Sequence, residues 1–308
     1  MSISNYPNGF ANGVTIRGVP ITVTNPGETF WVNSTAVLAK GGKGGSNGND
    51  GTYQKPFATI DYAISRCTAN RGDTIVVMPG HSEDIAAATS LVLDVAGVSV
   101  IGLGSGDNRP DLNFSATGSS VEIDAANVTL YNLTFTADVS AVVVGVNVDA
   151  NYATIDNCEF NFNATGDDFV TMIDVDAVTG FTLSNSRLIA EGIAGCAEAI
   201  RLDTATEATI SGNYIFGDFT DGAIIGEGAA STGILIADNE IYNADTTAGF
   251  VVDLNVACTG ILAGNRCGTL FATAPETALD PGQLLCVENY VVNAIDESGT
   301  IVPTVLST

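Results

Sequence analysis

A short pattern of apolar and polar residues recurs through the C-terminal two-thirds of the chain. Each copy has an apolar residue, two turn-like or polar residues, then a Leu, Cys, Ser or Asn, one variable residue and a second apolar residue. The fourth positions are Leu133, Cys158, Ser186, Asn213, Asn239, Asn265 and Asn289, separated by 25, 28, 27, 26, 26 and 24 residues. A repeat of this length predicts a solenoid built from stacked, nearly equal coils.

A second apolar run lies in each period, starting at Val142, Phe169, Ala199, Ala223 and Phe250. These runs alternate and favour Val, Ile and Phe, as strands do. The period overlaps that of leucine-rich repeats, but their pattern is absent and no segment between the phrases favours a helix. We therefore predict an all-β, right-handed parallel β-helix of about eight coils, with its hand taken from the crossover rule for parallel strands.

The alternation assigns roles within each coil. The first apolar residue of each phrase is expected to point inward and stack on its copies along the axis; these residues are Ile155, Leu183, Ile210, Ile236 and Leu262. The Asn residues at the fourth position are expected to form a polar ladder at one turn, where Asn also tolerates a left-handed backbone. We interpret this ladder as a structural feature of the solenoid and not as a functional site.

The N-terminal third reads differently, and three regions are predicted: an arm with a Gly-rich linker (1–49), a capping helix segment (50–72) and the β-helix (73–308). Apolar residues at Phe57, Ile60 and Ile64 have helical spacing, with Pro56 suited to the first turn. Such a helix would cover the open end of the solenoid. Residues 41–50, GGKGGSNGND, have the composition of a flexible linker. The arm could dock on a larger structure, or form a strand pair packed on its own helix.

The charge of the chain excludes several functions. The formal net charge is −25, and from Asp111 onward there are 27 acidic residues and three arginines. This surface repels nucleic acid and anionic membranes. No apolar stretch approaches the ~20 residues of a membrane span, and no signal peptide is recognised, so synthesis in a cytoplasm is expected. The six cysteines show no metal-binding spacing and are expected to be buried reduced thiols.

Five acidic residues are the best catalytic candidates, because each is expected to end the second strand of successive coils. They are Asp149, Asp176, Asp203, Glu227 and Asp253, at spacings of 27, 27, 24 and 26. Coils ~4.8 Å apart would bring carboxylates to the roughly 5–5.5 Å or 6.5–9.5 Å separations of glycosidases. A lyase would need a basic residue nearby, and only Arg187 and Arg201 lie in mid-solenoid. The favoured interpretation is a solvated acidic edge without catalysis or cofactor, and the alternative is a row of weak Ca²⁺ sites.

The N-terminal third also resembles a known superfamily. The pairing of DGT…KPFATIDYAI with GDTIVVMPGHSEDI resembles the entry segment of pectate-lyase-like parallel β-helix proteins, which include bacteriophage tailspikes and other virion proteins. The stretch NYPNGFANGVTIRGVPI resembles N-terminal segments of phage structural proteins. The chain departs from the pattern at His81–Ser82, where many relatives carry a Thr-Tyr pair.

The resemblance implies a structural virion protein made in the host cytoplasm and displayed on the virion surface. We expect a homotrimeric capsid decoration protein, of the cement or head-fibre kind, that binds the phage major capsid protein or another virion protein. The docking residues expected in its arm are Tyr6, Phe10, Ile16, Arg17 and Trp31. The mean hydropathy of +0.28 favours outward faces that partners bury. The alternative is a tailspike or tail fibre that binds or cleaves host polysaccharide.

A third hypothesis is a non-catalytic carbohydrate-binding module, which needs exposed aromatic side chains along one face. The solenoid offers Tyr214, Phe216, Phe219 and Tyr242, whereas Trp31 is expected outside it. Aromatic residues inside coils usually stack in the core, so this set is expected to be buried.

Overall fold

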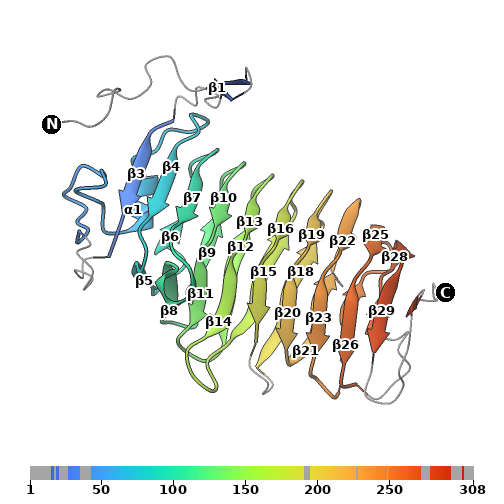
Figure 1. The fold of residues 1–308 in the computed structure, drawn as a ribbon. Helices are drawn as coiled ribbons and strands as arrows, with labels where there is room; N and C mark the ends of the chain where they lie inside the picture. The colour runs from blue at the N-terminus through green and yellow to red at the C-terminus, as the bar shows by residue number, and fades with distance from the viewer. Residues whose placement is uncertain are drawn as a thin grey trace.

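The computed structural model describes residues 15–16, 19–20, 27–34, 43–190, 195–226, 228–247, 249–271, 278–292 and 300–301. The chain winds into a parallel β-helix whose coils stack from the N-terminal to the C-terminal end (Figure 1). Three sheets run the length of the solenoid, and each of eight complete coils contributes one strand to each sheet. The predicted fold class and number of coils are confirmed.

Each coil passes through the first, the second and the third sheet in that order. The first sheet holds β3 (Thr29–Val32), β4 (Thr74–Val77), β7 (Ser99–Gly102), β10 (Thr129–Tyr131), β13 (Thr154–Asp156), β16 (Thr182–Ser184), β19 (Thr209–Ser211), β22 (Ile234–Ala237), β25 (Thr259–Ala263) and β28 (Gln283–Val287). The second holds β5 (Ser82–Ile85), β8 (Asp111–Phe114), β11 (Thr134–Ala137), β14 (Glu159–Phe162), β17 (Arg187–Ile189), β20 (Tyr214–Gly217), β23 (Glu240–Asn243), β26 (Arg266–Thr269), β29 (Asn289–Val292) and the antiparallel β30 (Thr300–Ile301). The third holds β6 (Leu91–Val92), β9 (Val121–Ile123), β12 (Val142–Val148), β15 (Phe169–Asp176), β18 (Cys196–Asp203), β21 (Phe219–Gly226), β24 (Val252–Leu254) and β27 (Leu279–Asp280).

The core runs along the solenoid axis. The residues predicted to point inward pair in register from coil to coil and are fully buried, as Leu183 with Ile155 and Ile210 shows. Phenylalanines add stacked layers, and the rings of Phe135 and Phe160 lie 4.6 Å apart. Because each inward side chain meets the apolar side chain at the equivalent position one coil away, burial continues without a break along the axis.

The predicted Asn ladder is confirmed at the turn between the first and second sheets. The side-chain amide of Asn213 donates to Oδ1 of Asn239 at 3.0 Å, Asn239 donates to Asn265 at 3.0 Å, and Asn265 donates to Asn289 at 2.9 Å. Each of these oxygens also accepts the backbone N–H of the preceding Asn. All four residues are buried, so the ladder satisfies polar groups that water does not reach.

The left-handed backbone of this turn lies one residue earlier than expected. It falls on Asn132, Asn157, Asn185, Gly212, Asp238, Gly264 and Glu288, with φ between +51° and +67°. These residues precede the ladder position and turn the chain, which leaves the ladder side chain free to point inward. The prediction that the ladder Asn itself adopts this conformation is therefore wrong.

The capping helix is much shorter than the predicted 50–72 segment. Helix α1 spans only Ile60–Ile64, with Thr59 as its N-cap, and its side chains Ile60, Ala63 and Ile64 are buried. Pro56 lies before the helix, not in its first turn. The reason is that the Phe57 N–H donates to the carbonyl of Trp31 in β3 and the Phe57 carbonyl accepts from the N–H of Asn33 just after it, which holds this segment extended.

Two expectations about the N-terminal region are wrong. Strand β3 pairs in parallel with β4, so Trp31 belongs to the first sheet of the solenoid and not to a separate arm. Residues 43–50 are not a free linker: the N–H of buried Gly45 donates to the carbonyl of Ser34, and a side chain there would overlap the backbone of Asn33. Within the arm, β1 (Thr15–Ile16) and β2 (Val19–Pro20) form an antiparallel pair.

All six cysteines are free; four are buried, and Cys67 and Cys286 are half-buried. Burial raises the pKa of the Cys158 thiol to about 12, which keeps it protonated at neutral pH. Across the described ranges, no helix is long and apolar enough to cross a membrane.

Candidate functional site

The predicted carboxylate column exists on the third sheet, but only in part. Asp176 and Asp203 pair in register, and Asp149 stands level with them because Val148 pairs with Val175. Glu227 lies outside the described residues. Asp253 is misplaced by the prediction: it lies inside β24 and pairs with Ile225 and Asp280, two positions away from the column. Sequence spacing alone did not reveal this change of register between coils.

A second column, which the sequence interpretation missed, lies two residues before the first. Its members pair in register and are Glu122, Asn147, Asp174, Arg201, Ile225, Asp253 and Asp280. The signal was present in the sequence, because alternate residues of one strand share a face. Counting back two positions from Asp149, Asp176 and Asp203 would have found Asn147, Asp174 and Arg201.

Hydrogen-bond donors lie between carboxylates of the third sheet. The amide of Asn147 donates to Glu122 at 2.8 Å and to Asp149 at 2.9 Å. Two coils further on, the guanidinium of Arg201 lies 3.5 Å from Asp174 and also pairs with Glu198. Each donor thus bridges acids that would otherwise face one another.

Glu198 is the most buried of the acids that the structure describes on this face. It is 2% exposed and accepts a hydrogen bond of 2.7 Å from Thr171 Oγ1 in addition to its ion pair with Arg201. A shallow concavity of about 390 Å³ lies nearby and is lined by Gly118, Ser119, Ser120, Glu122, Val143, Val144, Asn147 and Asp174. Burial raises the pKa of Asp174, and the Arg201 guanidinium opposes this rise.

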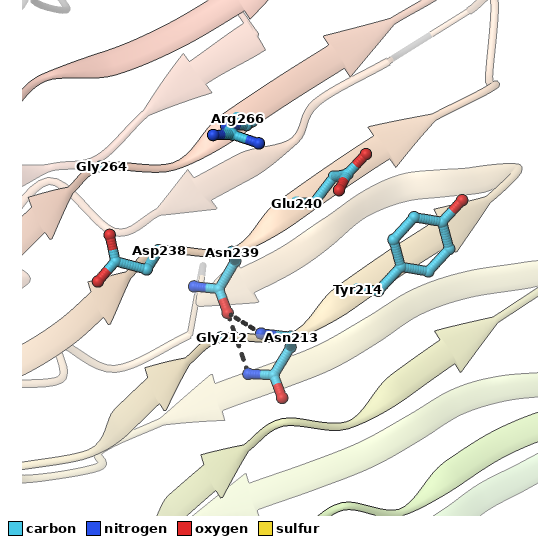
Figure 2. Close-up of a pocket in the computed structure, with 8 residues that line it drawn as sticks. All are labelled: Gly212, Asn213, Tyr214, Asp238, Asn239, Glu240, Gly264 and Arg266. Carbon is cyan, nitrogen blue, oxygen red and sulfur yellow. Dashed lines mark hydrogen bonds between the residues drawn. The ribbon is translucent and has the colours of Figure 1, made fainter.

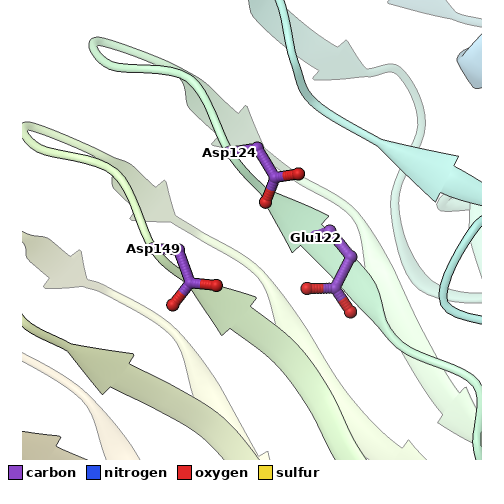
Figure 3. A group of neighbouring side chains, drawn as sticks. All are labelled: Glu122, Asp124 and Asp149. Carbon is purple, nitrogen blue, oxygen red and sulfur yellow. The ribbon is translucent and has the colours of Figure 1, made fainter.

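Three acids at the N-terminal end of the columns come close enough to share a cation. Glu122, Asp124 and Asp149 point toward one another from neighbouring coils (Figure 3), and their carboxylate oxygens lie within 4.8 Å of one another. Partial burial raises the pKa of Asp124, and the charges of Glu122 and Asp149 add to the rise. Hard oxygen ligands suit Ca²⁺, which takes six to eight of them, so water would have to complete the shell. The sequence predicted a row of weak Ca²⁺ sites along the column from Asp149 to Asp253, and of the predicted residues only Asp149 belongs to this trio.

The outer face of the second sheet carries a different set of groups. Arg187, Tyr214, Glu240 and Arg266 pair in register along the axis, and Phe216 pairs with Tyr242 beside them. The expectation that the aromatic residues are core stacks holds only for Phe219, which is fully buried. Tyr214, Phe216 and Tyr242 lie on the outer face because each is directly next in sequence to an inward-facing residue, Ile215 or Ile241, and successive side chains of a strand point to opposite faces.

A concavity of about 340 Å³ opens beside this row, at the turn between the first and second sheets (Figure 2). Its lining residues are Gly212, Asn213, Tyr214, Asp238, Asn239, Glu240, Gly264 and Arg266. The two Asn residues form its floor through the ladder, whereas Asp238, Glu240 and Arg266 are exposed. The site therefore offers two carboxylates, one guanidinium and one phenol ring to solvent.

The two mid-solenoid arginines lie on different faces. The guanidinium of Arg187 lies over the ring of Tyr214, 4.9 Å from its centroid, and is thus on the second sheet. Only Arg201 lies among the acids proposed for catalysis. The one histidine, His81, is buried at the N-terminal end, where Nε2 lies 3.0 Å from Glu83.

Of the five residues predicted to dock the arm, Tyr6, Phe10 and Arg17 lie outside the described residues. Ile16 is in β1, and Trp31 is half-buried in β3 with its ring edge-on to Tyr53 at 5.1 Å.

No protein-family model matches the sequence, and no curated protein sequence matches it. Among solved structures, a rhamnogalacturonan lyase is similar over 90% of each chain, with a TM-score of 0.42 and 12% sequence identity. At this identity the likeness concerns the fold alone.

Proposed function

We propose that the protein is a structural component of a bacteriophage virion, a homotrimeric capsid decoration protein of the cement or head-fibre kind. Its N-terminal arm would bind the major capsid protein or another virion protein, and its solenoid would project from the particle surface. The sequence resemblance of the N-terminal segments supports the phage assignment. One observation on the solenoid supports assembly: an uncharged apolar face on its last coils.

This surface, the C-terminal apolar face, lies on the outside of the first sheet. In earlier coils one outward position holds Thr74, Ser99, Thr129, Thr154, Thr182 and Thr209 in register. In the last three coils this position holds Leu235, Ile261 and Leu285, and the neighbouring one holds Ala237, Ala263 and Val287. Leu285 is 63% exposed and Ile261 43% exposed.

Charge makes this face suited to contact between copies. Two chains of net charge −25 repel wherever their acidic surfaces approach. The C-terminal apolar face carries no charge, and burying it contributes roughly 25 cal/mol per Å² of apolar surface. Copies would meet here at the least electrostatic cost, and a closed ring of three buries the same face in each copy.

Sedimentation velocity at micromolar concentration tests the assembly. We expect the wild-type protein to sediment as a trimer, and the double variant Ile261→Lys/Leu285→Lys as a monomer. Thr182→Lys, on the polar part of the same sheet, is the matched control and should remain trimeric. A monomeric wild-type protein would overturn the trimer.

The virion assignment needs a separate measurement. Mass spectrometry of purified phage should detect the protein, and labelled protein added to particles should decorate heads in electron micrographs. Label at the tail tip would instead support the alternative, a tailspike or tail fibre. Virions that neither contain nor bind the protein would contradict both.

The alternative function, binding or cleavage of host polysaccharide, is favoured by Arg201 and the acids around it. Asp176 and Asp203 lie one coil apart beside this guanidinium, where they could act as acid and base on a sugar chain. Cleavage of a glycan panel that is lost in Asp176→Asn and Asp203→Asn, but kept in Asp84→Asn, an exposed acid in β5 at the N-terminal end of the second sheet, would support catalysis. No cleavage by the wild-type protein would count against it.

A further inference from the structure

Two arginines on the second sheet have no acidic partner among the residues that the structure describes, in a chain rich in acids. Neither Arg187 nor Arg266 lies within ion-pair distance of a carboxylate among the described residues, although Arg71, Arg109 and Arg201 each do. Both are exposed, and they stand on one register line with Tyr214 and Glu240 between them. Positive charge that is not neutralised within the chain remains available to an external anion.

Aromatic rings form a continuous surface beside this line. The rings of Tyr214 and Phe216 are almost parallel, with an interplanar angle of 5°, and Phe216 and Tyr242 stack at 5.2 Å with an angle of 11°. In the next coil Gly268 leaves room for Tyr242, because a Cβ there would lie 2.7 Å from a carbon of its ring. Phe216 is 37% exposed, so this aromatic surface is open to solvent.

The concavity next to the rings adds polar groups of both kinds. Asp238 and Glu240 can accept hydrogen bonds from neighbouring hydroxyls, and Arg266 can donate two parallel hydrogen bonds to a carboxylate (Figure 2). Gly212 and Gly264, both with φ of +67°, have no side chain at the turn positions on either side of Asp238. They keep the concavity open along the direction of the axis.

These groups together match an acidic sugar chain. Aromatic surface packs against the apolar face of a sugar ring, carboxylates accept from its hydroxyls, and arginines bind its carboxylate or sulfate groups. The groups repeat at the coil spacing of ~4.8 Å, so Arg187 and Arg266 stand roughly 14 Å apart along the axis. A linear ligand lying along the solenoid could contact every one of them.

We infer that the outer face of the second sheet between Arg187 and Arg266 is a binding site for an acidic glycan. Tyr214, Phe216 and Tyr242 form the platform, the arginines bind the acidic groups, and Asp238 and Glu240 bind hydroxyls. This site is separate from the acidic columns of the third sheet and from the C-terminal apolar face. It therefore requires neither trimerisation nor catalysis.

Binding of defined oligosaccharides to the full-length protein tests this site. A glycan array should show binding to uronate-containing or sulfated oligosaccharides and not to neutral ones of the same length. Titration calorimetry on the best ligand of each acidic class then tells carboxylate from sulfate. Protein that binds no acidic glycan, or binds neutral and acidic glycans equally, would overturn the inference.

Variants on the outer face locate the site. Arg187→Gln, Arg266→Gln and Tyr242→Ala should each weaken binding by about tenfold, the effect expected when one stacked or charge-assisted contact is removed. Tyr131→Ala removes an exposed aromatic ring from the first sheet and is the matched control, with affinity unchanged. Thermal melting checks that each variant is folded. Folded variants that bind as well as the wild-type protein would exclude this face.

Discussion

The Asn ladder and the carboxylate columns of the third sheet are both rows of polar side chains along the solenoid, but they differ in burial. The Asn ladder is buried, and its amides bond from coil to coil through Asn213, Asn239, Asn265 and Asn289. The described carboxylates of the two columns on the third sheet are exposed or half-buried, and the donors Asn147 and Arg201 lie among them. An amide both donates and accepts, so identical residues can stack, whereas ionised carboxylates only accept and repel one another.

Breaking the ladder should have the largest effect. Asn239→Ala removes the acceptor of two Asn213 donors and leaves the carbonyl of Ile210 without its side-chain donor. Because buried groups without partners cost about 1–3 kcal/mol each, we expect a loss of roughly 2–4 kcal/mol in the free energy of unfolding. Urea denaturation measures it. Asn163→Ala, which removes one exposed hydrogen bond to Asp138, should change stability by less than about 0.5 kcal/mol.

The acidic trio should respond to calcium. If Glu122, Asp124 and Asp149 hold Ca²⁺ with a dissociation constant of about 1 mM, 10 mM calcium would stabilise the fold by about 1.4 kcal/mol. Calorimetric melting with Ca²⁺ and with NaCl of equal ionic strength measures this. Asp149→Asn should abolish the difference, and Asp238→Asn should keep it. An equal response of the wild-type protein to both salts would eliminate the site.

Replacing the donor Asn147 by an acid should increase the repulsion among the carboxylates of the third sheet. Asn147→Asp would place like charges at Glu122, Asp149 and position 147, with no donor between them. We expect a loss of about 1 kcal/mol at low ionic strength that shrinks in 1 M NaCl, where the screening length is about 3 Å. An unchanged unfolding midpoint at low salt would show that Asn147 is not needed to separate the acids.

The smallest effect concerns pH, because the groups involved are only partly buried. Burial raises the pKa values of Asp111, Asp124 and Asp174 above 3.8. A carboxyl with a raised pKa stabilises the fold fully below its unfolded value, and this stabilisation is lost as the pH rises through its folded pKa. Asp73 acts oppositely: although burial disfavours its charge, hydrogen bonds from Arg71, Thr68 and Glu28 lower its pKa, so its contribution is lost at lower pH.

We therefore expect the contribution of these carboxyls to urea resistance to be largest near pH 4 and to fall as the pH is raised toward 7, at matched ionic strength. The wild-type protein should therefore gain less stability over this range than Asp174→Asn, which lacks one of the carboxyls with a raised pKa. An equal change in the wild-type protein and in Asp174→Asn would contradict this sign.

The fold could be predicted from the sequence because the same pattern of residues recurs in every coil. The inward apolar residues and the Asn ladder recur once per coil, so each copy confirms the others. The site was harder to predict, since it depends on register. Asp253 lies in the column of Asp174 and Arg201 because the chain between β21 and β24 differs in length from the matching segment of other coils. Tyr214, Phe216 and Tyr242 face outward, although their residue type suggested the core. Local composition does not decide which of two alternating faces a strand buries.

The regular spacing of the Asn ladder also relates the length of the solenoid to its number of coils. Each coil adds ~4.8 Å of height, and the ladder positions mark where one coil can be exchanged for the next. Deleting residues 213–238, the 26 residues from one ladder Asn to just before the following one, would bring Asn239 into the place of Asn213. The rod would then be one step shorter with its end surfaces unchanged. Related proteins of different length could thus arise by gain or loss of whole coils, and the number of coils would set the distance between the two ends.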